Sequence, residues 1–154
     1  MEVRMEQFQI PSGALLLVAD GRRALFLRNV GTVMSVELEI TDVMEAEPNP
    51  PNREQGSGPA DRVVRQSGVR GTSTVETPDY HSRAENEFLV RVMSALDRHV
   101  QQGNTRAVVL VAPPKALATL RRVISPLVKT CLRGEIPKDL VKEPLEEIAA
   151  PLQS

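Results

Sequence analysis

The chain has 154 residues, of which 41% are hydrophobic and 25% are charged, and its formal net charge is −1. These values are ordinary for a soluble globular protein, and the near-neutral charge excludes a global attraction to nucleic acid or to an anionic membrane. Either partner would have to meet a local basic patch. Aromatic residues make up 3% of the chain and Trp is absent, which argues against a protein that stacks single-stranded bases on aromatic side chains.

The cysteine count and the N-terminal residues bear on the compartment. A single Cys allows no intramolecular disulfide, as expected in a reducing compartment. Residues 1–9 are polar and charged, and the apolar run at residues 15–18 is too short for a signal peptide or a membrane span. We therefore expect a cytoplasmic protein without membrane insertion, with a lead-in at residues 1–13 and one α/β domain at residues 14–154.

Two unbroken apolar runs, at residues 14–20 and 107–112, predict strands that are buried on both faces. Asp20-Gly21 is a hairpin dipeptide of the kind in which glycine commonly takes a positive φ, so residues 23–29 should run back antiparallel. Residues 34–41 alternate between apolar and polar side chains. This period of two predicts a half-exposed strand at the edge of the sheet.

A stretch of different composition follows at residues 45–80, which are rich in Pro, Gly, Ser, Asn and Arg and show no sustained apolar period. We predict a loop of unusual length there, and such loops are generally functional or disordered. Ser82 and Glu85 have the spacing of a capping box, which predicts that a helix begins at that point. Its apolar stripe includes Phe88, a predicted core anchor, and Gly103 is expected to end the helix.

The rest of the chain alternates between strand and helix. Pro113-Pro114 ends the second buried strand, and apolar residues return at helical spacing over residues 115–124. Ser125-Pro126 should break that helix, and alternation over residues 127–132 predicts a last strand. Pro144 fits the first turn of a final helix.

The predicted order is three strands, the long loop, and then helix, strand, helix, strand, helix. Three antiparallel strands followed by two strands reached through helical crossovers give a mixed five-stranded sheet. The two most apolar strands should be central neighbours, so we predict the strand order 3-2-1-4-5 with helices on both faces. This α/β arrangement is ribonuclease H-like.

The side chains that could carry chemistry have simpler structural explanations. His81 is a candidate general base or phosphate contact, or a polar residue that orders the loop. We predict that His99 lies on the helix surface and that Cys131 is a buried or half-buried thiol in the last strand. Two histidines and one cysteine without paired spacing predict no zinc site.

Asp20 and Glu85 stand where acidic residues of ribonuclease H-like enzymes hold magnesium. A two-metal site needs several convergent carboxylates, and Asp20 is more simply a turn residue and Glu85 a helix cap. The sequence holds no catalytic constellation beyond this pair. We therefore expect no metal or cofactor, and we interpret the chain as a binding protein in preference to an enzyme.

Short motifs spread over nearly the whole chain occur together in one order and spacing. They are Leu17-Val18-Ala19-Asp20-Gly21 with Arg23-Ala24, Asp61-Arg62, Ser67-Gly68 with Arg70, Asp79-Tyr80-His81 with Glu85 and Phe88, Val111-Ala112-Pro113-Pro114 with Leu117, Leu120 and Arg121, and Lys138-Asp139-Leu140. In this combination the chain resembles the host attachment protein family, bacterial relatives of the middle domain of the archaeal and eukaryotic peptide-chain release factor.

The resemblance implies the fold of that release-factor middle domain, in agreement with the predicted topology. In that domain the loop before the long helix carries Gly-Gly-Gln, whose glycines let bare backbone enter the peptidyl transferase centre while the Gln helps to place the hydrolytic water. The nearest equivalent here is Gln66, which follows Val64-Arg65. Because these side chains restrict the backbone, the sequence argues against peptide release by that mechanism. Gln66 and His81 are the candidate catalytic residues.

The family label implies attachment to host cells, and the kinship with release factors implies ribosomes and peptidyl-tRNA. Guanidinium groups suit phosphates, so we predict a surface for the ribosome, tRNA or other RNA. Its candidate residues are Arg62, Arg65, Ser67, Arg70, His81 and Arg83. The alternatives are a non-enzymatic interaction protein that serves attachment directly or indirectly, and a peptidyl-tRNA hydrolase or nuclease. No DNA sequence recognition is expected, and the sequence leaves the oligomeric state open.

Overall fold

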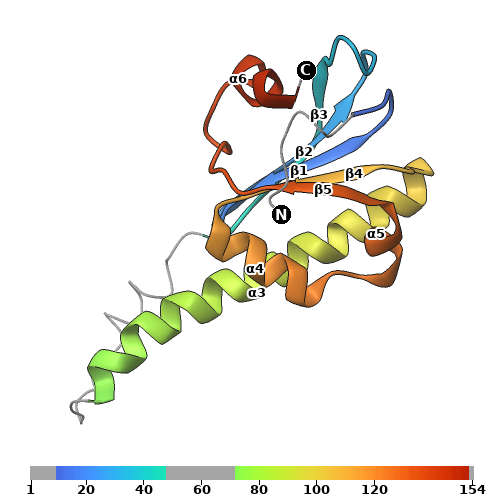
Figure 1. The fold of residues 1–154 in the computed structure, drawn as a ribbon. Helices are drawn as coiled ribbons and strands as arrows, with labels where there is room; N and C mark the ends of the chain where they lie inside the picture. Colours follow the sequence, from blue (N-terminus) through green and yellow to red (C-terminus); the bar gives the residue numbers. More distant parts are fainter. Residues whose placement is uncertain (1–9, 48–71, 153–154) are drawn as a thin grey trace, which may run out of the picture.

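The computed structural model describes residues 10–47 and 72–152, with side chains in the second range from Ser82 onward. Five strands form one sheet in the order β3-β2-β1-β4-β5 (Figure 1). The strands are β1 (Leu15–Ala19), β2 (Arg23–Asn29), β3 (Leu38–Glu45), β4 (Val108–Val111) and β5 (Leu132–Ile136). The first three are antiparallel, whereas β4 pairs in parallel with both β1 and β5. The predicted mixed sheet and its strand order are confirmed.

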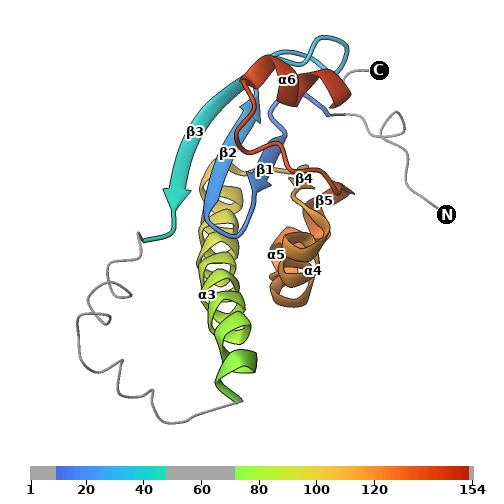
Figure 2. The same ribbon diagram turned by 90° about the vertical axis from the view of Figure 1, so that its left-hand side faces the viewer.

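Helices cover both faces of this sheet, as Figure 2 shows. They are α3 (Thr72–Gly103), α4 (Pro114–Val123), α5 (Pro126–Cys131) and α6 (Leu145–Ala149), the last followed by the 3₁₀ turn η2 (Ala150–Leu152). α3, α4 and α5 lie on one face and α6 lies on the other. None of the helices within the described ranges has the length and hydropathy to cross a membrane.

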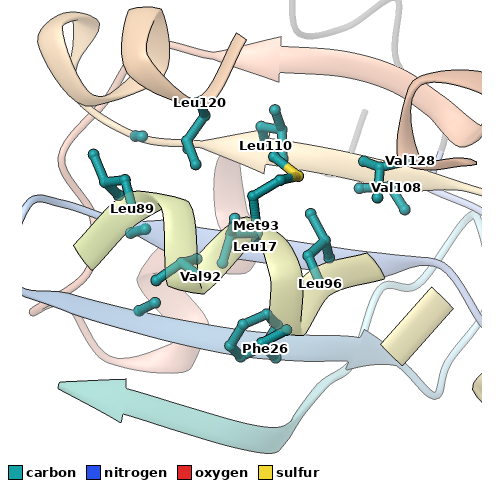
Figure 3. Packing of buried hydrophobic residues seen from close by; sticks show 14 of the residues in the cluster. Leu17, Phe26, Leu89, Val92, Met93, Leu96, Val108, Leu110, Leu120 and Val128 are labelled. Atoms are coloured by element: carbon teal, nitrogen blue, oxygen red, sulfur yellow. The ribbon is translucent and has the colours of Figure 1, made fainter. Parts of the chain in front are cut away.

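The core consists of two layers separated by β1 and β4, whose residues are all buried. On the α3 side, Leu17, Phe26 and Leu110 of the sheet meet an apolar stripe of the helix (Figure 3). That stripe is formed by Phe88, Leu89, Val92, Met93, Leu96 and Val100. On the other side, Leu16, Val18 and Val109 pack with Ile148 and Leu152. A strand with apolar side chains on both faces requires this double cover.

The edge strand starts later than predicted, because β3 begins at Leu38 and ends at Glu45. The preceding turn is held by the buried side chain of Asn29. Its Oδ1 accepts the amides of Gly31 and Glu37 at 2.9 and 3.0 Å, and its Nδ2 donates to the carbonyl of Ile10 at 2.9 Å. These side-chain hydrogen bonds replace strand pairing in the first half of the predicted strand.

A change of register lies inside β3. Phe26 pairs with Asp42, whereas its neighbour Leu27 pairs with Ile40, so Thr41 is an extra residue. The Thr41 hydroxyl donates to the carbonyl of Phe26 at 3.0 Å. Such a bulge reverses which residues face each side, and it explains why the alternation in the sequence ends near Thr41 although the strand continues.

The predicted strand at residues 127–132 is wrong, because α5 occupies most of that range and β5 begins only at Leu132. The Ser125 hydroxyl accepts the amide of Val128 at 3.1 Å, and Pro126 stands in the first turn. This N-cap with a following proline starts a helix. Cys131 is therefore buried at the end of a helix and not in a strand.

α3 begins at Thr72, ten residues before the predicted capping box. Residues 72–80 are thus helical and not part of a loop, and residues 48–71 lie outside the described ranges. Ser82 and Glu85 do not cap the helix, because they lie inside it, and their side chains contact other elements. The Ser82 hydroxyl accepts from Lys115 Nζ at 3.4 Å, and the Glu85 side chain packs against Gly21. The predicted end at Gly103 is confirmed.

The last helix differs from its prediction by one residue. Pro144 is the N-cap of α6 and not a residue of its first turn. The predicted inner face is confirmed, since Ile148, Ala149 and Leu152 are buried and Leu145 packs partly against them.

Phe88 is fully buried between α3 and the sheet, which confirms its predicted place. We expect Phe88→Ala to lower the free energy of unfolding by about 3–5 kcal/mol, because it removes a ring and leaves a cavity. Denaturant unfolding measures this change. Val90→Ala, on the exposed side of the same helix, should change stability by less than about 0.5 kcal/mol. If Phe88→Ala lowered the free energy of unfolding by less than about 1 kcal/mol, the packing of Phe88 would be contradicted.

Candidate functional site

A hollow of about 250 Å³ lies where β1 and β4 end, and we call it the strand-end hollow. Three segments line it: Asp20, Gly21 and Arg22 of the turn after β1; Glu85, Asn86 and Leu89 of α3; and Pro113, Lys115, Ala116 and Thr119 at the start of α4. β1 and β4 are parallel neighbours. The carboxyl ends of adjacent parallel strands are where ligand sites of α/β sheets commonly form.

Asp20 holds the turn that forms one wall of the hollow. Its Oδ1 accepts the amides of Arg22 and Arg23, both at 2.8 Å, and its own amide donates to the carbonyl of Arg23 at 2.9 Å. The predicted structural role is confirmed, because these bonds are those of an Asx turn. They also occupy one oxygen of the carboxylate that a metal site would need.

The backbone of Gly21 differs from the prediction. Its φ is not positive, since Gly13 is the glycine with positive φ in the described chain. A Cβ on Gly21 would lie 2.8 Å from Cδ and 2.9 Å from Cγ of Glu85. The side chain of Glu85 therefore lies directly over the turn, and it would have to move if residue 21 carried a side chain.

Polar contacts tie the other two walls together. Thr119 of α4 is buried, and its hydroxyl donates to Oδ1 of Asn86 on α3 at 3.0 Å. Pro113 is the N-cap of α4 and supplies no side-chain cap. The first amides of α4 therefore have no side-chain partner at Pro113, and the helix dipole makes this end partly positive.

The charges of the hollow are balanced, with Arg22 and Lys115 opposite Asp20 and Glu85. Both cations are exposed, and within the described ranges neither makes an ion pair. No three His, Cys, Asp or Glu side chains of the described part are close enough to hold a metal ion. The hollow thus offers cations at its rim, and its two carboxylates fall short of a two-metal site.

Four residues of the predicted family motifs meet here: Asp20, Gly21, Glu85 and Pro113. Pro114 begins α4 just outside the lining, and Arg83 is exposed on α3. The remaining motif residues lie elsewhere. Arg121 donates to Glu135 Oε1 of β5 through Nη2 at 2.6 Å and through Nε at 2.7 Å, and this hydrogen-bonded pair raises the pKa of Arg121. Lys138 and Asp139 are exposed in the segment after β5.

The other predicted residues cannot be placed in this hollow. Gln66 and the loop residues Arg62, Arg65, Ser67 and Arg70 lie outside the described ranges. His81 belongs to α3, and its side chain lies outside the description. Conversely, Arg22, Asn86, Lys115 and Thr119 were not predicted. The sequence does contain a pattern from which Lys115 could have been predicted, because Pro-Pro-Lys begins a helix directly after a buried parallel strand.

His99 does not lie freely on the helix surface, and that prediction is wrong. Its Nε2 is 2.9 Å from Oδ2 of Asp42, and its ring centroid lies 4.8 Å from that of Phe26. The bulge at Thr41 brings Asp42 to this face of the sheet. The contact joins α3 to the edge strand, so it stabilises the fold at a distance from the hollow.

Three comparisons relate the chain to known proteins. Residues 15–152 match the family described as "Protein required for attachment to host cells". No curated protein matches the sequence significantly. Among solved structures, the fold is similar to the crystal structure of an archaeal translation termination factor, with a TM-score of 0.48 and 11% sequence identity. The match covers 92% of this chain and 34% of the termination factor chain, so this chain spans about a third of that structure.

The contact between Gly21 and Glu85 can be tested by a double-mutant cycle. We expect Gly21→Val to destabilise the protein by about 1 kcal/mol, because the side chain of Glu85 must move away from the new side chain. Glu85→Ala in the same chain should restore most of this loss, since it removes the colliding atoms. Denaturant unfolding of the four proteins measures the coupling. If the two effects simply add, a backbone requirement explains Gly21 and the contact does not.

Proposed function

The chain belongs to the family of proteins required for attachment to host cells, and we propose that it works by binding RNA, ribosomal or free, without cleaving it. The contact surface in this proposal is the end of the sheet that holds the strand-end hollow. The observation that carries it is the state of the charges there: the cations are exposed and unpaired within the described ranges, while the carboxylates contact the turn.

The cations are placed for phosphate contact. Arg22 projects from the turn after β1, and Lys115 stands in the first turn of α4. Both are exposed, and the first turn of α4, with its partial positive charge, lines the same hollow. Phosphate oxygens are bound in this way by guanidinium and ammonium groups together with helix N-termini.

The predicted RNA-binding segment is attached beside this surface. The amide of Ala46, just after β3, donates to the carbonyl of Arg22 at 2.8 Å. The chain therefore leaves the sheet next to Arg22 before it reaches Arg62, Arg65 and Arg70. Arg83 is exposed on α3, near Ser82, which contacts Lys115. In the proposal, Arg22, Arg83 and Lys115 form the described part of one basic surface.

The same geometry disfavours a nuclease or a peptidyl-tRNA hydrolase. Among the side chains that the structure describes, Asp20 and Glu85 are the two carboxylates that line the hollow, and no histidine or cysteine lines it. A general base must lie within hydrogen-bonding reach of the group that it activates. Asp20 holds backbone amides instead, and binding without hydrolysis is the simpler use of the site.

A protein partner is the second candidate, and the edge of the sheet favours it. Met34, Ile40 and Val43 are 83%, 48% and 40% exposed, and they lie on β3 or just before it. An edge strand with open backbone groups can pair with a strand of another chain. Such a complex would resist high salt, whereas RNA binding through phosphates weakens as salt rises.

We expect the double variant Arg22→Gln/Lys115→Gln to bind RNA about tenfold more weakly, because two phosphate contacts are lost. The slope of log affinity against log salt should fall by about 1.4, as expected for two contacts to a single strand. Fluorescence anisotropy with labelled ribosomal RNA fragments, together with ribosome co-sedimentation, measures both. Arg98→Gln/Lys129→Gln removes the same charge from exposed helix positions and serves as control. Equal losses in both double variants would contradict the assigned surface.

Glu85→Gln separates binding from catalysis. The carboxylate of Glu85 opposes a phosphate in the hollow, and a unit charge about 6 Å away in water is worth about 0.7 kcal/mol. The amide keeps the shape that packs over Gly21, so RNA binding should tighten about threefold. If the site were hydrolytic, the same variant would instead abolish a magnesium-dependent cleavage of RNA. Anisotropy and a cleavage assay on one preparation distinguish these outcomes.

A further inference from the structure

A second hollow, of about 590 Å³, lies at the opposite end of the sheet, where β1 and β4 begin and α3 ends. Three arginines line it, and we call it the arginine hollow. The remaining lining residues are Pro11, Ser12, Gly13, Ala14, Gly103, Asn104, Thr105 and Ala107. No carboxylate is among the lining residues that the structure describes, in contrast to the balanced strand-end hollow.

We propose that the arginine hollow is a phosphate-binding site formed by Arg28, Arg106 and Arg133. This inference does not depend on the proposed function, which rests on the other end of the sheet. Three positively charged residues line this one hollow. The C-terminal end of α3 opposes them with only about half a negative charge. The surplus is therefore strongly positive, and concave surfaces concentrate such a field.

Arg28 is held in place before any ligand arrives. Its Nη1 donates to the carbonyl of Gly13 at 2.7 Å and to the hydroxyl of Thr105 at 3.1 Å. A Cβ on Gly103 would lie 2.8 Å from Nη2, so glycine at this position leaves room for the guanidinium. Within the described part, Nε and Nη2 of Arg28 have no hydrogen-bond partner. A fixed guanidinium with free donors is preorganised to bind an oxyanion.

Arg133 reaches the hollow through an irregularity of the sheet. Val108 pairs with Leu132, but the next residue, Val109, pairs with Gly134. Arg133 is thus the extra residue of a bulge, and bulges commonly redirect a side chain beside a functional site. Arg106 stands just before β4 and is exposed, as is Arg133. In the described ranges neither arginine has a hydrogen bond or an ion pair with another side chain.

The backbone makes a turn at two places in the lining of the hollow. Gly13, at φ 87°, and Asn104, at φ 51°, are the residues with positive φ in the described chain. Glycine takes such a φ readily. At Asn104 it belongs to the C-terminal cap of α3, where the amide of Thr105 donates to the carbonyl of Val100 at 3.1 Å. These turns lead the chain from α3 to Arg106 and from Gly13 into β1, so they shape the hollow without being evidence for a ligand.

The lining also indicates the class of ligand. Among the described lining residues there is no aromatic side chain to stack on a base or a ring. The volume is within the range of about 300–1,000 Å³ that is usual for small-molecule sites. The ligand should therefore be recognised through its phosphate groups, which two sources can supply: a small phosphorylated molecule or the backbone of a nucleic acid.

Inorganic pyrophosphate is the probe for the first experiment, because it consists only of the phosphate groups that both classes of ligand share. Isothermal titration calorimetry of the full chain at low ionic strength should show saturable binding. Arg106→Gln/Arg133→Gln should weaken it at least tenfold, since charge-assisted hydrogen bonds are lost. Arg28 is left in place because it holds Gly13 and Thr105. The control Arg98→Gln/Lys129→Gln should bind as the parent does. The proposal would be overturned if the parent showed no saturable binding, or if both double variants lost affinity equally.

Two further titrations identify the source of the phosphate and keep this inference separate from the proposed function. A short single-stranded RNA that displaces pyrophosphate shows that a nucleic-acid backbone fits the site. If the RNA does not displace pyrophosphate, the ligand is a small phosphorylated molecule. Both results agree with a phosphate-binding site. Arg22→Gln/Lys115→Gln should bind pyrophosphate as the parent does. If that variant loses pyrophosphate binding while Arg106→Gln/Arg133→Gln keeps it, the arginine hollow is wrongly assigned.

Discussion

The parallel pairing of β1 with β4 is the constraint on which the rest of the structure depends. Every residue of both strands is buried, and each Leu or Val hidden from water contributes roughly 1.5–3 kcal/mol. An exposed ion pair such as Arg121–Glu135 contributes at most about 1 kcal/mol. Burial therefore decides the architecture: both faces of the two strands must be covered, so α3 to α5 take one side and α6 the other. The two ends of the same strand pair then define where the two hollows can form.

The sheet was predictable because its central strands leave few choices. Unbroken apolar runs with a turn or proline after them permit only interior strands, and this is enough for the order 3-2-1-4-5. The edges were not predictable from periodicity. Asn29 holds a turn where alternation predicted a strand, and Ser125 starts a helix where alternation predicted another. In both places one polar side chain accepts hydrogen bonds from backbone amides that would otherwise pair with a strand. A hydrophobic pattern does not show which of these two partners the amides take.

The strand-end hollow was partly predictable, because Asp20 and Pro113 directly follow parallel neighbours and must lie at one edge. Glu85 was found for the wrong reason: its spacing from Ser82 imitates a helix cap, while its actual neighbour is Gly21. The arginine hollow was beyond sequence reasoning. Arg28, Arg106 and Arg133 come from three distant segments, and Arg133 joins the others only through a register shift between β4 and β5. Such a shift depends on tertiary packing, which no local pattern shows.

The length of α3 has a geometric consequence. Its first turns extend past the sheet (Figure 1), and Phe88 is its first fully buried residue in the described side chains. With a rise of about 1.5 Å per residue, Thr72 stands roughly 24 Å along the axis from that anchor. The number of residues before Phe88 therefore sets both how far the beginning of the helix lies from the sheet and in which direction it faces. Removing seven residues would shorten it by about 10 Å and turn its beginning by only about 20°, whereas removing five would point the preceding chain toward the opposite side. The length of α3 thus fixes the distance and the direction of its first residue from the strand-end hollow.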